Sequence, residues 1–157
     1  MKKMLSNNST DPKNRFSVPL KNEHTITIPA STEYLNRVRG FVAELAKTSG
    51  FSDEDVEEIR LAVDEACTNV IKHAYNNNST GQIKVKVTVN GRQLDISLFD
   101  SGNAFDPETY TSPNLQERVR RKKRGGMGIY LIRKFMDKVE YRRSDACNEI
   151  CMTKIKN

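Results

Sequence analysis

Residues 58–75 decide the fold, and they read EIRLAVDEACTNVIKHAY. Apolar residues recur there at spacings of three and four, which predicts a helix with one apolar stripe against the core. That stripe comprises Ile59, Val63, Ala66 and Val70. A second stripe beside it carries Glu65, Asn69 and Lys72 at the same spacings. The helix therefore presents a carboxylate, an amide and an ammonium in one line next to the core.

The second stripe has two interpretations. Asn69 could bind magnesium through its carbonyl oxygen, because magnesium prefers oxygen ligands and keeps several waters. Glu65 could accept a proton from a hydroxyl group or water, and Lys72 could contact phosphate. The alternative is a solvated helix face with an ordinary Glu–Lys pair. This helix alone leaves both open.

The segments around this helix predict an α+β fold. Ser31 and Ser52 are expected to cap two successive helices, and Gly50 ends the first. Alternating apolar residues on either side of Asn90–Gly91 predict a hairpin. The other expected elements are strands at 24–28, 139–142 and 149–155 and a short helix at 126–136. We therefore expect a two-layer sandwich with helices on one face of a mixed, mainly antiparallel sheet.

Length and composition favour a single soluble domain. The chain has 157 residues, of which 36% are hydrophobic, enough for one modest core. Residues 1–20 are polar and contain two prolines, so we expect a mobile tail followed by one domain at 21–157. No apolar run has the length of a membrane span, and the first residues lack the apolar stretch of a signal peptide. The expected location is cytoplasmic.

A basic run lies inside a long polar segment. The net charge is +6, and residues 118–124 read RVRRKKR. Residues 101–125 are polar and contain Pro107 and Pro113, and loops of this length are usually functional lids or disordered segments. Clustered cations indicate nucleic acid as one class of partner. A solvated loop is the alternative.

Two glycine-bearing loops follow the central helix. The first reads LFDSGNAFDP at residues 98–107. Asp100 could accept a hydrogen bond from the amino group of adenine, and Gly102 would let the backbone approach the ring. The second reads RGGMGIYLI at residues 124–132, with three glycines before an apolar helix, which suits a phosphate group. It matches neither the Walker nor the Rossmann pattern, and each loop also fits an ordinary turn.

The order and spacing of these segments resemble the Bergerat ATP-binding fold of the GHKL superfamily of ATPases and kinases. Glu-x-x-x-Asn on a helix is followed by Asp-x-Gly at a strand end and by a long lid that closes on Gly-x-Gly. Three stretches are most similar to the bacterial anti-sigma factor serine/threonine-protein kinases. They are DEACTNVIKHAY at 64–75, GNAFDP at 102–107 and GMGIYLIRKFMD at 126–137. The resemblance covers about residues 22–155.

The resemblance implies roles for individual residues. Glu65 matches the catalytic base, Asn69 the magnesium ligand, and Asp100 the adenine-binding aspartate. The other residues that it places around ATP are Lys72, His73, Gly102, Ala104, Phe105, Arg124, Gly125, Gly126, Met127, Gly128 and Ile129.

This resemblance gives the basic run a different interpretation, because the run falls in the implied ATP lid at about residues 103–125. Arg124 stands where related kinases carry an arginine that meets the terminal phosphate. Gly126 and Gly128 match the glycines that flank the triphosphate. The cations of the run would then face phosphates or an acidic partner, and direct binding of nucleic acid is disfavoured.

Two positions depart from the superfamily. One is Arg124, where several relatives carry an additional lid glycine, and the other precedes the last strand. Many members carry Gly-Thr before the last strand, and that threonine helps to hold adenine. This chain has Cys147–Asn148 at the corresponding step. Asn148 or Thr153 could replace the threonine, and the sequence does not choose between them.

The implied function is that of a Mg²⁺- and ATP-dependent protein-serine kinase. It would phosphorylate an anti-sigma factor antagonist and sequester a sigma factor, as a homodimer. The first alternative is an ATP-binding partner switch without kinase activity. A histidine-kinase catalytic domain is disfavoured, since no phosphoacceptor helix precedes it and Glu65 stands where those kinases often have Asn or His. A basic nucleic-acid-binding domain would leave Glu65, Asn69 and Asp100 unexplained.

Overall fold

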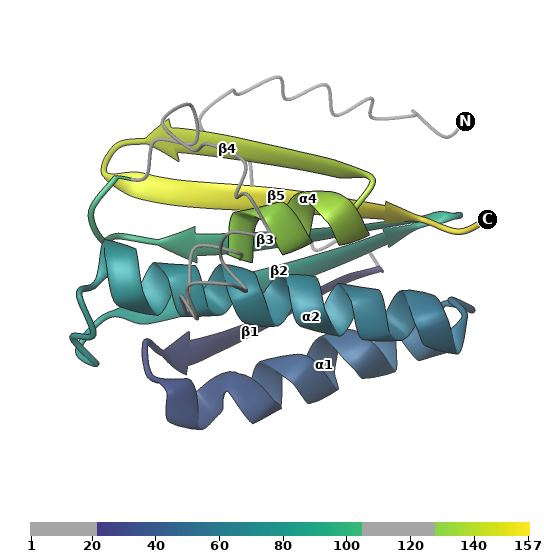
Figure 1. Ribbon diagram of the computed structural model, residues 1–157, viewed down its shortest axis with the longest axis horizontal. Coiled ribbons are helices and arrows are strands. Elements are labelled where there is room, and N and C mark those ends of the chain that lie inside the picture. Colours follow the sequence, from purple (N-terminus) through teal and green to yellow (C-terminus); the bar gives the residue numbers. More distant parts are fainter. Residues whose placement is uncertain (1–21, 105–127) are drawn as a thin grey trace, which may run out of the picture.

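A five-stranded sheet forms one layer of the protein, and the computed structural model describes the chain over residues 22–104 and 128–157 (Figure 1). The strands are β1 (Glu23–Pro29), β2 (Gln82–Asn90), β3 (Gln93–Asp100), β4 (Lys138–Ser144) and β5 (Cys147–Ile155). Their order across the sheet is β1-β2-β3-β5-β4. Every pairing between these strands is antiparallel, so the described part of the sheet lacks the parallel component of a mixed sheet.

The three α-helices of the described ranges form the second layer and cover one face of the sheet (Figure 1). They are α1 (Leu35–Thr48), α2 (Asp53–Asn69) and α4 (Gly128–Phe135). The expected α+β sandwich is therefore confirmed. No helix in the described ranges combines the length and the apolar character that crossing a membrane requires.

The core lies between the two layers and follows from the alternation of the strands. Successive side chains of a strand point to opposite faces of the sheet, so every second residue faces the helices. Six inward residues of the central hairpin are fully buried, and they are Ile83, Val85, Val87, Leu94, Ile96 and Leu98. Ile59 and Val63 of α2 pack against them with no exposed surface. The apolar stripe expected for this helix is thus its buried face.

The long central helix does not keep one geometry to its end. Ser52 caps it as expected, since its Oγ accepts a hydrogen bond from Asp55 N at 3.1 Å. After Asn69 the α-helix gives way to the π-helical turn η2 (Val70–Ala74). Such turns are rare and are frequently found at functional sites. This one widens the helix just before the loop that leads to β2.

A buried lysine connects the C-terminal strand to the helical layer. Lys154 of β5 is 7% exposed on the face that carries the helices. Its Nζ lies 2.5 Å from Oε2 of Glu58 on α2 and 2.6 Å from the carbonyl oxygen of Phe135, the last residue of α4. The ammonium is thus satisfied by two helices at once, which fixes the end of α4 against α2 and β5.

The Lys154→Ala variant is expected to lose about 3 kcal/mol of unfolding free energy. This is the low end of the range for removing one partner of a buried ion pair, because Glu58 is 29% exposed and keeps access to water. Urea unfolding of the two proteins measures the difference. Lys138→Ala is the matched control, because its ion pair with Glu140 is exposed and screened by solvent, so its loss should be much smaller. Equal losses for the two variants would contradict the anchoring role.

Candidate functional site

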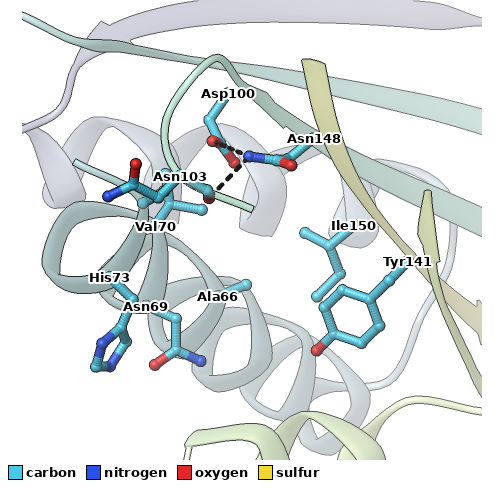
Figure 2. Close-up of a pocket in the computed structure, with 10 residues that line it drawn as sticks. Ala66, Asn69, Val70, His73, Asp100, Asn103, Tyr141, Asn148 and Ile150 are labelled. Carbon is cyan, nitrogen blue, oxygen red and sulfur yellow. Dashed lines mark hydrogen bonds between the residues drawn. The ribbon is translucent and has the colours of Figure 1, made fainter. Parts of the chain in front are cut away.

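A cavity opens between the last turns of α2, the π-helical turn and the β4–β5 hairpin (Figure 2). It is lined by Ala66, Asn69, Val70, His73, Ala74, Asp100, Asn103, Tyr141, Asn148 and Ile150. Figure 2 shows Asp100 and Asn148 together at one side, with Asn69 and His73 on the helix. The structure therefore brings the end of the central helix, the end of β3 and the last hairpin to one cavity, although these segments lie far apart in sequence.

Asp100 is the last residue of β3, and one of its two carboxylate oxygens is hydrogen-bonded within the protein. The residue is only 7% exposed. Its Oδ1 accepts hydrogen bonds from Gly102 N at 3.0 Å and from Asn148 Nδ2 at 2.8 Å. No described residue donates to its Oδ2. The cavity thus contains a buried acceptor that suits a single N–H donor on a ligand.

The register of β5 distinguishes Asn148 from Thr153, between which the sequence could not choose. Asn148 is paired with Asp100, whereas Thr153 is paired with Asp95 five residues earlier on β3. The hydroxyl of Thr153 donates to Asp95 Oδ1 at 2.6 Å. Asp95 and Thr153 lie outside the cavity lining, so the structure brings Asn148 to the cavity and leaves Thr153 away from it.

Gly102 is required by a close approach of two backbones. A Cβ at this position would lie 2.3 Å from the carbonyl oxygen of Ala74, which no real contact allows. The same oxygen accepts a hydrogen bond from Asn103 N at 2.7 Å. The glycine therefore lets the loop after β3 dock on the end of the π-helical turn, a reason different from the expected approach to a ring.

Tyr75 fixes the same loop from the other side. Its hydroxyl accepts a hydrogen bond from Ser101 N at 2.8 Å and donates one to the carbonyl oxygen of Gln82 at 2.7 Å. The ring also packs on Gly81, where an added Cβ would come within 2.5 Å of it. One side chain thus joins the start of β2 to the loop that follows Asp100.

Glu65 and Asn69 meet at the first residue of α4. A Cβ on Gly128 would lie 2.9 Å from Glu65 Oε2 and 3.2 Å from Asn69 Oδ1. The missing side chain therefore lets the start of α4 approach both residues closely. Next to it, Ile129 is buried, with 9% exposure.

Three other expected residues of the described chain lie at its surface. His73 is exposed and lines the cavity, while Lys72 and Ala104 are exposed and do not line it. Five expected residues lie outside the described ranges, and they are Phe105, Arg124, Gly125, Gly126 and Met127. The expected lid at about 103–125 lies outside them as well, apart from its first two residues.

The side-chain oxygen of Asn69 is the kind of ligand that a hard cation such as Mg²⁺ prefers. In residues 22–104 and 128–157, no group of three or more His, Cys, Asp or Glu side chains could hold a metal. A cation here would therefore take most of its ligands from phosphates and water. Magnesium usually binds in this way, through one or two protein oxygens and a substrate.

The environment of Glu65 makes it a stronger base than an ordinary carboxylate. Burial raises the pKa of Glu65, and the negative charge of Asp64 raises it further, while Lys72 opposes both. Asp64 is itself held by Arg39, whose Nη2 lies 2.6 Å from Asp64 Oδ1. A raised pKa brings a general base closer to the pH at which it works.

The raised pKa of Glu65 predicts a pH-dependent gain in stability for Glu65→Gln. The folded state binds the Glu65 proton more tightly than the unfolded state, so this contribution is complete below the ordinary pKa of 4.5 and is lost as the pH rises through the raised value. The variant should therefore gain stability over the unmodified protein as the pH rises from 4 to 7. Urea unfolding at both pH values measures this change, and a constant difference would contradict it.

Four residues of this region received no role from the sequence, and they are Tyr75, Asn103, Tyr141 and Ile150. Tyr141 and Ile150 are paired in register across β4 and β5 and form the wall opposite α2 (Figure 2). The alternation of β5 places Ile150 on the same face as Met152, which was a usable signal. The roles of Tyr75 and Asn103 depend on contacts between loops, which no local pattern reveals.

Comparisons with known proteins give consistent matches. Residues 28–154 match the family described as Histidine kinase-like ATPase domain. The chain is 33% identical over 137 residues to the serine-protein kinase RsbW of Bacillus velezensis, covering 83% of each chain. It is 28% identical to the RsbW of Bacillus subtilis, again covering 83% of each chain.

Solved structures show the same fold. A structure of the RsbU and RsbW domains of a Mycobacterium tuberculosis protein matches with a TM-score of 0.61 at 18% identity, over 85% of this chain and 32% of that one. The catalytic domain of the histidine kinase ThkA matches with a TM-score of 0.51 at 13% identity, over 85% and 96%. At these identities the likeness concerns the fold alone.

Proposed function

Because the chain belongs to the family of histidine kinase-like ATPase domains and, within it, to the serine-protein kinases RsbW, we propose that its cavity binds ATP for phosphoryl transfer to a protein serine. The observation that carries this proposal is the shared cavity. It places the buried Asp100 at one side and Asn69 at the other, with Glu65 one helical turn from Asn69.

The adenine ring would lie between the helix and the last hairpin. Ala66 and Val70 supply an apolar wall on one side and Ile150 supplies one on the other. Asp100 Oδ2 would accept the hydrogen bond of the exocyclic amine. Guanine carries an oxygen at that position, so it would leave a buried carboxylate without a partner, a cost of about 1–3 kcal/mol.

The phosphates would extend toward the start of α4. Asn69 would hold Mg²⁺ through Oδ1, and the ion when bound would neutralise the charge of the phosphate oxygens. Lys72 is exposed on the same helix face and would add positive charge. Gly126 and Arg124 would approach the phosphates from the lid.

Glu65 would act as the general base. Its carboxylate would accept the proton of the serine hydroxyl as that oxygen attacks the γ-phosphorus. In phosphoryl transfer most of the rate enhancement comes from positioning and charge stabilisation, and general-base help contributes about 10²–10⁴-fold. The half-buried position of Glu65 and its raised pKa fit this role.

The protein partners follow from family membership. We infer that the phosphorylated protein is an anti-sigma factor antagonist and that the chain, as a cytoplasmic homodimer, sequesters a sigma factor.

The direct test is a transfer assay. Proteins that co-purify with the full chain from its native cell would be incubated with it, Mg²⁺ and γ-labelled ATP. The expected result is label on a serine of one small partner. A chain that binds ATP and the partner but transfers no label would be a binding switch without kinase activity.

A further inference from the structure

The β4–β5 hairpin holds two polar side chains opposite each other beside the cavity. Arg143 and Asn148 are partners in the strand register, one pair before the tight turn at Asp145–Ala146. Both turn residues adopt left-handed backbone angles, with φ of +46° and +60°. Positive φ at both central residues is the geometry of a type I′ turn, whose twist matches that of the flanking strands. The turn thus fixes the pair in space.

The amide of Asn148 has one orientation that satisfies all its neighbours. Arg143 Nη1 donates to Asn148 Oδ1 at 2.6 Å. On the other side, Asn148 Nδ2 lies 2.8 Å from Asp100 Oδ1, 3.2 Å from the Gly102 oxygen and 3.1 Å from the Asn103 oxygen. All three of these partners are acceptors. A reversed amide would place its oxygen against them and its NH₂ against a cation.

The donor group of Asn148 in turn fixes the orientation of the Asp100 carboxylate. Asn148 Nδ2 and Gly102 N both donate to the same oxygen, Oδ1. That oxygen is thereby occupied, and the carboxylate presents Oδ2 as the acceptor for a ligand. Asp100 is 7% exposed, so water does not readily take the place of a lost donor.

We propose that Arg143 is a positioning residue for nucleotide selection, which acts on Asp100 through the amide of Asn148. This proposal rests on the proposed function, because Asp100 is the adenine acceptor only if ATP occupies the cavity. Arg143 itself would touch no part of the nucleotide.

A double-mutant cycle on ATP affinity tests this chain of contacts. Arg143→Ala is expected to raise the Kd for ATP about 3- to 10-fold, the size expected for one net hydrogen bond. Asn148→Ala is expected to raise it about 10-fold or more, since its acceptor is charged. If Arg143 acts only through Asn148, the double variant should bind ATP as the Asn148→Ala variant does. Additive effects, or an unchanged Kd for Arg143→Ala, would overturn the proposal.

Arg142→Ala is the matched control. Arg142 is the neighbouring arginine on β4, but it pairs with Glu140 and Glu149 on the opposite face of the sheet. Its removal changes the net charge by the same amount and should leave the Kd for ATP unchanged. A loss equal to that of Arg143→Ala would mean that general charge, not amide orientation, sets the affinity, and it would overturn the proposal.

Two further readouts separate positioning from folding. Arg143 is exposed, so thermal unfolding without nucleotide should be the same for Arg143→Ala and the unmodified protein. In the transfer assay the variant should raise KM for ATP and leave kcat unchanged. Failure of the unmodified chain to bind ATP would refute the proposed function itself. If the unmodified chain binds ATP and the Arg143→Ala variant binds it with the same Kd, only the role of Arg143 is refuted.

Discussion

The Asp100→Asn variant is expected to bind ATP about 5- to 150-fold more weakly than the unmodified protein. This range corresponds to about 1–3 kcal/mol for a buried polar group that loses its partner. The amide keeps its oxygen toward Gly102 N and Asn148 Nδ2, which are both donors. Its NH₂ group then points to the adenine amine, so donor faces donor. Isothermal titration calorimetry with Mg-ATP measures the loss.

Asp95→Asn provides the matched control for this experiment. Asp95 lies on the same strand and also accepts a hydrogen bond from a residue of β5, Thr153. It is outside the cavity lining, so its replacement should leave ATP affinity unchanged. Unchanged affinity for Asp100→Asn, in a variant with normal thermal unfolding, would remove Asp100 from the adenine site.

The Glu65→Gln variant is expected to keep ATP affinity and to lose about 10²–10⁴-fold in the rate of transfer to serine. Glutamine has nearly the same shape and keeps an oxygen near Gly128, but it cannot take up the serine proton. The measurement is single-turnover transfer from γ-labelled ATP to the protein partner. Calorimetry on the same sample shows whether ATP still binds.

Glu57→Gln is the control for Glu65. It lies two turns earlier on α2, is 62% exposed and pairs with Arg60. Its replacement should change neither affinity nor transfer. A Glu65→Gln variant with a transfer rate within a few fold of normal would show that the proton leaves by another route, and catalysis would then depend on positioning and charge alone.

Much of the fold could be predicted from spacing in the sequence. Periods of three and four in residues 58–75 placed the buried face of α2, because a helix that packs on a sheet must bury one stripe. Alternation on either side of Asn90–Gly91 placed the central hairpin and its inward residues. These patterns are local and strong, so the helix and the hairpin that they predict are both present in the folded protein.

The architecture of the cavity could be predicted only in part. Asp100 and Asn69 were expected to converge, and both line it. Alternation along β5 places Asn148 and Thr153, five residues apart, on opposite faces of the sheet. The pairing of Asn148 with Asp100 depends on the register of β5 against β3, which the pattern of one strand does not give. The π-helical turn at 70–74 also left no signal, because its wider hydrogen bonds form where the loop at Gly102 docks on Ala74.

The shared hydrogen bonds of Lys154 have a consequence for how the protein opens. The ammonium binds the last carbonyl group of α4 and an acid of α2 together, so separating that end of α4 leaves a buried ammonium with one partner fewer. Local opening there should therefore cost more than the fraying of an unanchored helix end, and its backbone amides should exchange with solvent more slowly. The helix is short, yet one end of it is held against fraying.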